Sequence, residues 1–187
     1  MHFSDKQVSI IKALATMLEQ PGSGRITTAA LAREMNHSEA ALYRHYANKA
    51  AIFEGLISLV GEQILEDLAH IEATEPKGRL RLRKQLYALL LFVERHPGAA
   101  RVLTGGALVN EAPFLQTQVN ELLAHIETAL ANSASLGIEQ KELTGTATHL
   151  ASAVLHLALG KWLRYVQSGC QAAPTLEASA LFAALGL

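Results

Sequence analysis

Residues 25–56 read RITTAALAREMNHSEAALYRHYANKAAIFEGL, and the order of residue types in this stretch decides the fold. Thr27 and Ser38 each precede a short segment with helical apolar spacing, so both are expected to be helix N-caps. Asn36 lies between the two segments and predicts a tight turn, because Asn tolerates the left-handed backbone conformation. The stretch therefore predicts two short helices joined by a tight turn, which is a helix-turn-helix.

Apolar residues recur at helical spacing along most of the chain, and no alternation of period two is long enough for a strand. Helix breakers separate the periodic segments, beginning with PGSG at residues 21–24. A further loop is expected at residues 132–137, where Asn, Ser and Gly gather. The expected helices cover about 5–19, 27–35, 38–46, 48–75, 79–95, 97–104, 110–131, 142–167 and 175–185. The predicted fold class is all-α.

The composition and the N-terminal sequence indicate the cellular compartment in which the protein is expected. Half of the 187 residues are hydrophobic, yet no apolar run approaches the roughly 18 residues of a membrane span, so none is expected. Residues 1–6 lack a basic stretch followed by an apolar core, so no secretory signal is expected. Cys170 is the only cysteine, which excludes a disulfide within the chain and favours the reducing cytoplasm.

The formal net charge of −1 hides a modest asymmetry along the chain. The first 50 residues carry six basic and four acidic side chains, so the remainder is the more acidic part. The basic residues are Lys6, Lys12, Arg25, Arg33, Arg44 and Lys49. The positive end of the chain therefore coincides with the helix-turn-helix.

The second short helix is expected to protrude from the molecule. Leu31 and Ala32 of the first helix and Leu42 of the second face inward and fix the angle between them. A helix that protrudes in this way places the side chains near its N-terminal end against base edges in the major groove of DNA. The predicted set is Glu39, Ala40, Tyr43 and Arg44, and Ser38 at the start of the helix is also expected to bind DNA. Glu39 has two interpretations: it accepts a hydrogen bond from cytosine, or it only stabilises the helix N-terminus.

A second set of residues is expected to contact phosphates. Thr27 and Thr28 lie at a helix N-terminus, where free backbone N–H groups and the helix dipole favour an anion. Lys49 lies in the first turn of the next helix, and Tyr43 and His45 can donate hydrogen bonds. Such contacts position a protein on DNA without reading its sequence. The alternative is that these are ordinary surface residues.

The segment 142–167 has apolar residues on two sides. A helix of this kind must be covered on both sides, and a two-fold interface with a second copy of the chain would do so. Burial inside one subunit is the alternative. The expected dimer-interface residues, including one from the last helix, are Leu150, Val154, Leu157, Ala158, Trp162, Tyr165 and Leu181.

The residues that carry chemistry in enzymes and metal proteins do not form a recognisable set. His149 and His156 share a helix face, but no cysteine or carboxylate completes a set at ligand spacing. There is also no glycine-rich phosphate loop and no nucleophile motif. We therefore expect no metal ion, no cofactor and no enzymatic activity.

The helix-turn-helix resembles the DNA-binding domain of the TetR family. The resemblance is carried by Thr27-Thr28, Leu31-Ala32, residues 42–46 (LYRHY), Asn48-Lys49, Phe53 and Leu56. It implies three N-terminal helices that a fourth joins to a helical domain for dimerisation and regulation. The implied domains are 1–47 for DNA binding and 48–187 for regulation and dimerisation. The chain departs from the family at Asn36, where Gly is usual, and at Ala29, where some members carry a base-reading side chain.

Four stretches are similar to a subgroup of this family that acts in nucleoid occlusion. They are residues 25–32, 38–49, 79–108 and 115–127. The resemblance implies a protein that lies in the cytoplasm on the nucleoid, binds dispersed chromosomal sites and inhibits assembly of the division protein FtsZ there.

In that subgroup the FtsZ C-terminal tail docks between the fourth and fifth helices. The resemblance assigns this groove to Leu59, Ala88, Leu91 and Arg95, where an Arg can pair with an acidic tail. Leu91 replaces a small residue of the subgroup. The alternative function is a ligand-responsive transcriptional repressor, with a small-molecule pocket among the fifth to eighth helices.

Overall fold

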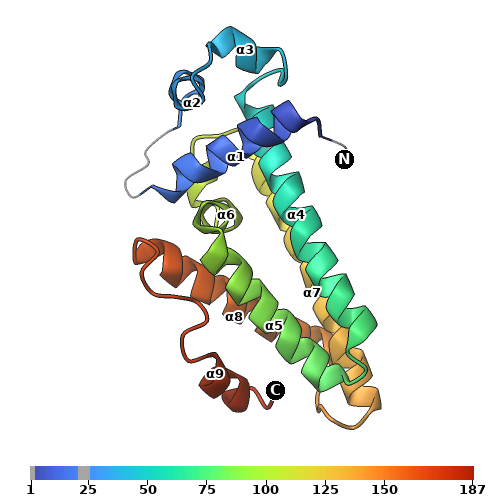
Figure 1. The fold of residues 1–187 in the computed structure, drawn as a ribbon. Coiled ribbons are helices and arrows are strands. Elements are labelled where there is room, and N and C mark those ends of the chain that lie inside the picture. Colours follow the sequence, from blue (N-terminus) through green and yellow to red (C-terminus); the bar gives the residue numbers. More distant parts are fainter. Residues whose placement is uncertain (1–2, 21–25) are drawn as a thin grey trace. The chain divides into compact units, whose positions relative to one another are not determined.

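The computed structural model describes residues 3–20 and 26–187 (Figure 1). In this part of the chain every regular element is helical, which confirms the all-α prediction. The elements are α1 (Asp5–Glu19), α2 (Thr28–Glu34), α3 (Glu39–Tyr43), α4 (Lys49–Thr74), α5 (Gly78–Arg95), α6 (Pro97–Leu103), the 3₁₀-helix η1 (Gly106–Leu108), α7 (Pro113–Glu139), α8 (Ala147–Gln167) and α9 (Ala178–Ala184). The break predicted at 21–24, and Arg25 of the positive end, lie outside the described residues.

The first three helices begin where polar side chains cap them. Ser4 and Gln7 form a reciprocal capping box at α1, and the side chains of Thr27 and Ser38 cap α2 and α3. Asn36 has a φ of 54°, the left-handed conformation that the turn was predicted to need. The caps at Thr27 and Ser38 and the turn at Asn36 are therefore as predicted from the sequence, whereas the capping box at Ser4 is found only in the structure.

Helix α3 is shorter than predicted, because it ends at Tyr43 rather than near residue 46. Tyr46 is almost fully buried, and its hydroxyl donates a hydrogen bond to the carbonyl oxygen of Gln7 at 3.3 Å. The chain leaves the helix after Arg44, and the segment that follows brings the Tyr46 ring into the core.

The chain forms two compact units. The first contains the described residues of 1–61 together with 96–120. In it, α1 packs closely on α6, since a Cβ atom at Gly98 would lie 2.3 Å from the carbonyl oxygen of Ala15. Its core is made by fully buried apolar side chains, among them Ile11, Leu14, Leu31, Leu42, Ile52 and Phe53.

The second unit contains residues 62–95 and 121–187. Helices α5 and α8 pack side by side in it (Figure 1). Trp162 is completely buried there, and its indole N–H donates a hydrogen bond to the carbonyl oxygen of Leu89 at 3.1 Å. Tyr165 is also buried and donates its hydroxyl hydrogen to the carbonyl oxygen of Glu94 at 3.2 Å. Two side chains of α8 are thus bonded to the backbone of α5.

The loop predicted at 132–137 is wrong, because α7 continues through it to Glu139. Ser133 and Ala134 are fully buried, and a Cβ at Gly78 would lie 2.0 Å from the backbone nitrogen of Gly137. The small residues that suggested a loop therefore allow close packing of helices. Helix α8 accordingly begins later than predicted, at Ala147, and is capped by the side chain of Thr146.

Helices long enough to cross a lipid bilayer are present, but within residues 3–20 and 26–187 none combines that length with sufficient apolar character.

Candidate nucleic-acid interface

Helices α2 and α3 are held at their starts by side-chain caps. The hydroxyl oxygen of Thr27 accepts a hydrogen bond from the backbone N–H of Ala30 at 3.1 Å. Ser38 accepts one from the N–H of Ala41 at 3.2 Å. Each hydroxyl keeps its own hydrogen for a further acceptor. The two caps therefore fix the helices and still leave a donor at each start.

The side chains predicted to lie between α2 and α3 are buried, as expected. Leu31 is 2% exposed, Ala32 3% and Leu42 1%. The opposite face of α3 is accessible, with Tyr43 47% exposed and Ala40 and Arg44 also exposed. The geometry thus provides a rigid short helix with a polar outer face.

A chain of hydrogen bonds joins α2 to both ends of α3. The hydroxyl of Tyr43 donates to the hydroxyl oxygen of Thr28 at 3.3 Å. Thr28 in turn donates to a carboxylate oxygen of Glu39 at 2.6 Å. Sequence reasoning placed these three residues in the site but missed their connection. The spacing of four between Glu39 and Tyr43 does show that they share a helix face.

Lys49 lies at the first residue of α4, as predicted, next to Asn48, which caps the helix by accepting from the N–H of Ala51 at 2.9 Å. Its ammonium group is not isolated, because it lies 2.5 Å from a carboxylate oxygen of Glu111 and 5.5 Å from the centre of the Phe53 ring. The two charged side chains are only 21% and 9% exposed. Sequence reasoning missed this carboxylate, since 62 residues separate the partners.

The segment after α3 is anchored on α1. Burial raises the pKa of Tyr46 to about 12, so its hydroxyl stays protonated and keeps donating to Gln7. The side-chain amide of Gln7 also donates to the carbonyl oxygen of His45 at 3.3 Å, and the side chain of His45 is exposed. The position of His45 at the outer surface is therefore set by contacts with the first helix.

Two of the residues predicted to bind the FtsZ tail line an open groove in the second unit. Ala88 and Leu91 are half-buried on α5 and line a groove of about 510 Å³. Its other lining residues are Ile71 of α4, Arg83, Lys84 and Tyr87 of α5, and Ala178, Ser179 and Phe182 of α9. Sequence reasoning missed the contribution of α9, because nothing local in residues 178–184 indicates what they pack against.

The groove is edged by cations and aromatic rings. The guanidinium of Arg83 lies 5.0 Å from the centre of the Phe182 ring, and Tyr87 meets the same ring edge to face at 6.4 Å. The predicted Arg95 is exposed at the end of α5, and Leu59 is half-buried on α4 within the first unit.

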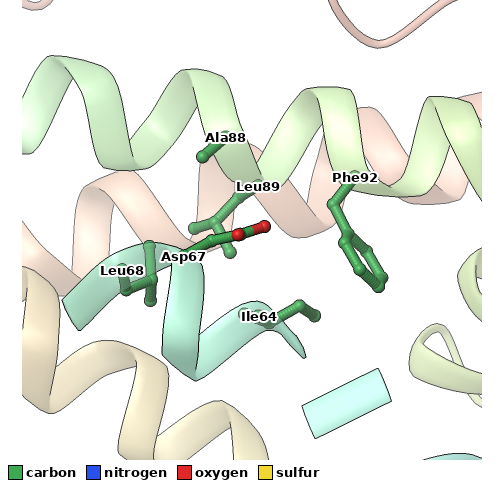
Figure 2. A pocket seen from close by; sticks show the side chains of 6 residues that line it. All are labelled: Ile64, Asp67, Leu68, Ala88, Leu89 and Phe92. Atoms are coloured by element: carbon green, nitrogen blue, oxygen red, sulfur yellow. The ribbon is translucent and has the colours of Figure 1, made fainter. Parts of the chain in front are cut away.

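Ala88 also lies in a second, smaller pocket (Figure 2). In this pocket α4 contributes Ile64, Asp67 and Leu68, and α5 contributes Leu89 and Phe92 beside Ala88. The close-up shows that Asp67 is the one acidic side chain among these apolar ones.

Four of the residues predicted to form a dimer interface are buried inside the single chain, so that assignment was wrong. They are Val154, Ala158, Trp162 and Tyr165, none of them more than 5% exposed. Burial within one subunit, the alternative, holds for this side of α8 because it packs on α5. Leu150, Leu157 and Leu181 are half-buried, and their role stays a prediction. The accessible face of α8, which sequence reasoning missed, carries His149, Ala153, His156, Gly160 and Leu163.

The histidines do not assemble with other metal-binding side chains in the described ranges. His156 accepts or donates a hydrogen bond with the hydroxyl of Ser152 at 3.2 Å. Across residues 3–20 and 26–187, no group of three or more His, Cys, Asp or Glu side chains has the geometry of a metal site.

Two models of known protein families match this chain, one in its N-terminal part and one in its C-terminal part. Residues 10–56 match the family model described as bacterial regulatory proteins, tetR family. Residues 77–185 match the SlmA-like model described as tetracyclin repressor-like, C-terminal domain.

Two relatives match almost the whole chain. The nucleoid occlusion factor SlmA of Shewanella halifaxensis is 40% identical over 174 residues, which cover 91% of this chain and 88% of the relative. That of Photobacterium profundum is 40% identical over 178 residues, covering 92% and 89%. Among solved structures, a TetR transcription regulator from Haloarcula marismortui has a TM-score of 0.82 at 20% identity, covering 98% of this chain and 97% of that one. The structural likeness shows the TetR fold.

Proposed function

Because the chain belongs to the TetR family, and within it to the SlmA-like nucleoid occlusion factors, we propose that it binds duplex DNA at chromosomal sites and blocks septum formation over the nucleoid. The observation that carries this proposal is the rigid, outward-facing α3. It is fixed from behind by Leu31 and Leu42 and presents Ala40, Tyr43 and Arg44 on its accessible side.

On DNA, α3 lies in the major groove with Glu39, Ala40 and Arg44 next to base edges. Donors at the starts of α2 and α4 and in the segment after α3 contact phosphates on either side. The phosphate-contacting residues are Thr27, Thr28, Ser38, Tyr43, His45 and Lys49. This division follows the usual one between contacts that read the sequence and contacts that position the protein.

The protein acts as a homodimer in the cytoplasm, associated with the nucleoid. Two copies of α3 then read a palindrome-like site whose half-sites are separated by whole helical turns. The accessible face of α8, with Ala153, Gly160 and Leu163, is the surface we assign to the second copy, flanked by the half-buried Leu150, Leu157 and Leu181. Support for this surface comes from its exposed Leu163, which is 46% accessible, whereas the buried side of α8 packs on α5.

The protein partner is the C-terminal tail of FtsZ. The groove residues Ala88 and Leu91 provide an apolar floor, and Arg95 provides a cation for an acidic residue of the tail. Support for this part of the proposal comes from the exposure of Arg95 and from the groove that Ala88 and Leu91 line.

Recovery of genomic fragments by the wild-type protein, followed by sequencing, tests the DNA-binding function. Many sites dispersed over the chromosome support nucleoid occlusion. A single site next to the protein's own gene, together with release of DNA by a small molecule, supports the ligand-responsive repressor instead. Arg44→Ala should weaken binding to the recovered sites by about 1–3 kcal/mol and relax the sequence preference at one position, as loss of a contact to a base edge does. Unchanged binding in this variant would show that α3 is not part of the DNA interface.

The division function is tested with a peptide of the FtsZ tail. Arg95→Glu should weaken peptide binding at least tenfold, as expected when an ion pair becomes a repulsion, and it should leave DNA affinity unchanged. Arg79→Glu is the matched control, because it makes the same charge change on an exposed residue at the other end of α5. Equal losses in the two variants would mean that the net charge of the protein, rather than this groove, governs binding.

A further inference from the structure

The hydrogen bonds between Tyr43, Thr28 and Glu39 run in one direction. A hydroxyl group has a single hydrogen to donate. Tyr43 gives its hydrogen to Thr28, and Thr28 gives its own to Glu39. Both hydroxyls that face the proposed phosphate positions are therefore already used within the protein. Neither can donate to a phosphate unless this chain of bonds opens.

The carboxylate at the end of the chain adds a charge to this arrangement. Glu39 is exposed on the accessible side of α3, and its oxygen lies 2.6 Å from the Thr28 hydroxyl oxygen. A phosphate that approaches Thr28 meets a like charge at hydrogen-bond distance from the same atom, and like charges at such a distance repel. Glu39 therefore opposes phosphate contacts as long as it stays on Thr28.

The carboxylate can leave Thr28 without loss only if another donor replaces that hydroxyl. In the major groove the amino group of cytosine is such a donor, and acidic side chains accept from it. If Glu39 turns to a cytosine, the hydrogen of Thr28 becomes available to a phosphate and the repulsion moves away from it. One hydrogen bond is lost and two are formed, one to the base and one to the backbone.

We propose that Glu39 is a specificity-determining residue that makes the phosphate contact of Thr28 conditional on a cytosine in the site. On other sequences the carboxylate remains on Thr28 and keeps the hydroxyl of Thr28 from the DNA backbone. The residue thus lowers affinity for random DNA more than it lowers affinity for the correct site. This inference rests on the proposed DNA-binding function and explains how α3 distinguishes sites.

The test compares Glu39→Gln with the wild-type protein on two duplexes. One duplex is a site recovered by the wild-type protein from genomic DNA, and the other is a scrambled sequence of the same composition. The glutamine removes the charge and keeps the shape, so affinity for the scrambled duplex should rise about threefold to tenfold at low salt. Affinity for the site should rise less or fall, so that the ratio of the two affinities drops.

Glu34→Gln is the matched control. It removes the same charge from an exposed residue of α2 that is not part of the Tyr43–Thr28–Glu39 chain. Its effect should be small and equal on both duplexes, leaving the ratio unchanged. If Glu34→Gln lowers the ratio as much as Glu39→Gln does, general electrostatics account for the effect and the inference is wrong.

Two further measurements separate a role in recognition from a role in folding. In the first, the cytosines of the site are replaced by thymine one at a time. At one position the replacement should weaken binding of the wild-type protein and leave the affinity of Glu39→Gln unchanged. Adding Thr28→Val to Glu39→Gln should abolish the gain on scrambled DNA, because the released hydroxyl is gone. A fall of both affinities together in Glu39→Gln would show a damaged fold and contradict the inference. Failure of the wild-type protein to bind any duplex would instead contradict the proposed function.

Discussion

The ammonium group of Lys49 lies 2.5 Å from the carboxylate of Glu111, so the cation at the start of α4 is neutralised by its own chain. The centre of the Phe53 ring lies 5.5 Å from the same ammonium group. A phosphate must therefore compete with a carboxylate that is already in place. Lys49 contributes less to DNA affinity in this arrangement than an isolated lysine at a helix N-terminus would.

Glu111→Gln should release this cation for DNA. We expect affinity for any duplex to rise about threefold at roughly 0.1 M salt, and the salt dependence to steepen by about 0.9 because one more phosphate is neutralised. Titrations of one duplex over a series of salt concentrations measure both quantities. Glu121→Gln, an exposed carboxylate on α7, is the control. An unchanged salt slope in Glu111→Gln would show that Lys49 does not reach a phosphate even when it is released.

The local part of the interface could be predicted from the sequence. Thr27, Ser38 and Asn36 act within a few residues of themselves, as caps and as a left-handed turn, so their neighbours in the sequence are also their neighbours in space. The ion pair of Lys49 with Glu111 could not be predicted, since it depends on where a turn 62 residues away is packed. The same limit applies to Phe182, whose contacts lie on α5.

Packing also decided which residues of α8 face outward. Periodicity shows that a helix has two apolar sides, but it does not show which side another helix of the same chain will cover. The bond from Trp162 to the carbonyl oxygen of Leu89 places that side against α5, which is why the predicted dimer residues on it were wrong. A run of small residues at 132–137 misled in the same way, because small residues serve loops and close helix contacts equally.

Substitutions on the two sides of α8 should have opposite consequences. Ala153→Arg places a long cation on the accessible face and should convert the dimer to a monomer while leaving the fold of the chain intact. Trp162→Phe removes the indole donor and part of a buried side chain, and should cost roughly 2–4 kcal/mol of unfolding free energy without changing the oligomeric state. Sedimentation and urea unfolding measure the two effects. A monomeric wild-type protein, or a dimer that survives Ala153→Arg, would exclude this face as the interface.

The close approach of Gly78 to Gly137 makes a prediction for stability. A Cβ at Gly78 would lie 2.0 Å from a backbone nitrogen, which cannot move aside as a flexible side chain can. Gly78→Ala should therefore lower the unfolding free energy by roughly 2–3 kcal/mol, as forced overpacking does. Gly106→Ala is the control, because its Cβ would meet only one atom, at 3.7 Å, and it should change stability by less than about 0.5 kcal/mol. Equal effects of the two substitutions would contradict the packing described for α5 and α7.

Glu75 should make stability depend on pH in the acid range. Its side chain is only 10% exposed, and one carboxylate oxygen accepts from the ammonium of Lys84 at 2.6 Å while the other accepts from the N–H of Lys77 at 3.1 Å. The hydrogen bond from Lys84 is the main cause that lowers the pKa of Glu75 in the folded protein, and the bond from Lys77 is the next.

A carboxyl group whose folded pKa is lowered stabilises the protein above its unfolded pKa, about 4.3 for Glu, and this stabilisation is lost as pH falls through the folded pKa. Glu75→Gln should therefore be less stable than wild type at pH 7, and the difference should shrink as the pH is lowered below about 4.3. Urea unfolding at a series of pH values measures the difference between Glu75→Gln and wild type. Lys84→Met removes the main donor to the carboxylate of Glu75. The unfolding free energy of this variant should therefore depend less on pH in the acid range than that of the wild-type protein. A Glu75→Gln difference that is the same at pH 3 and pH 7 would mean that the ionised carboxylate contributes nothing through Lys84.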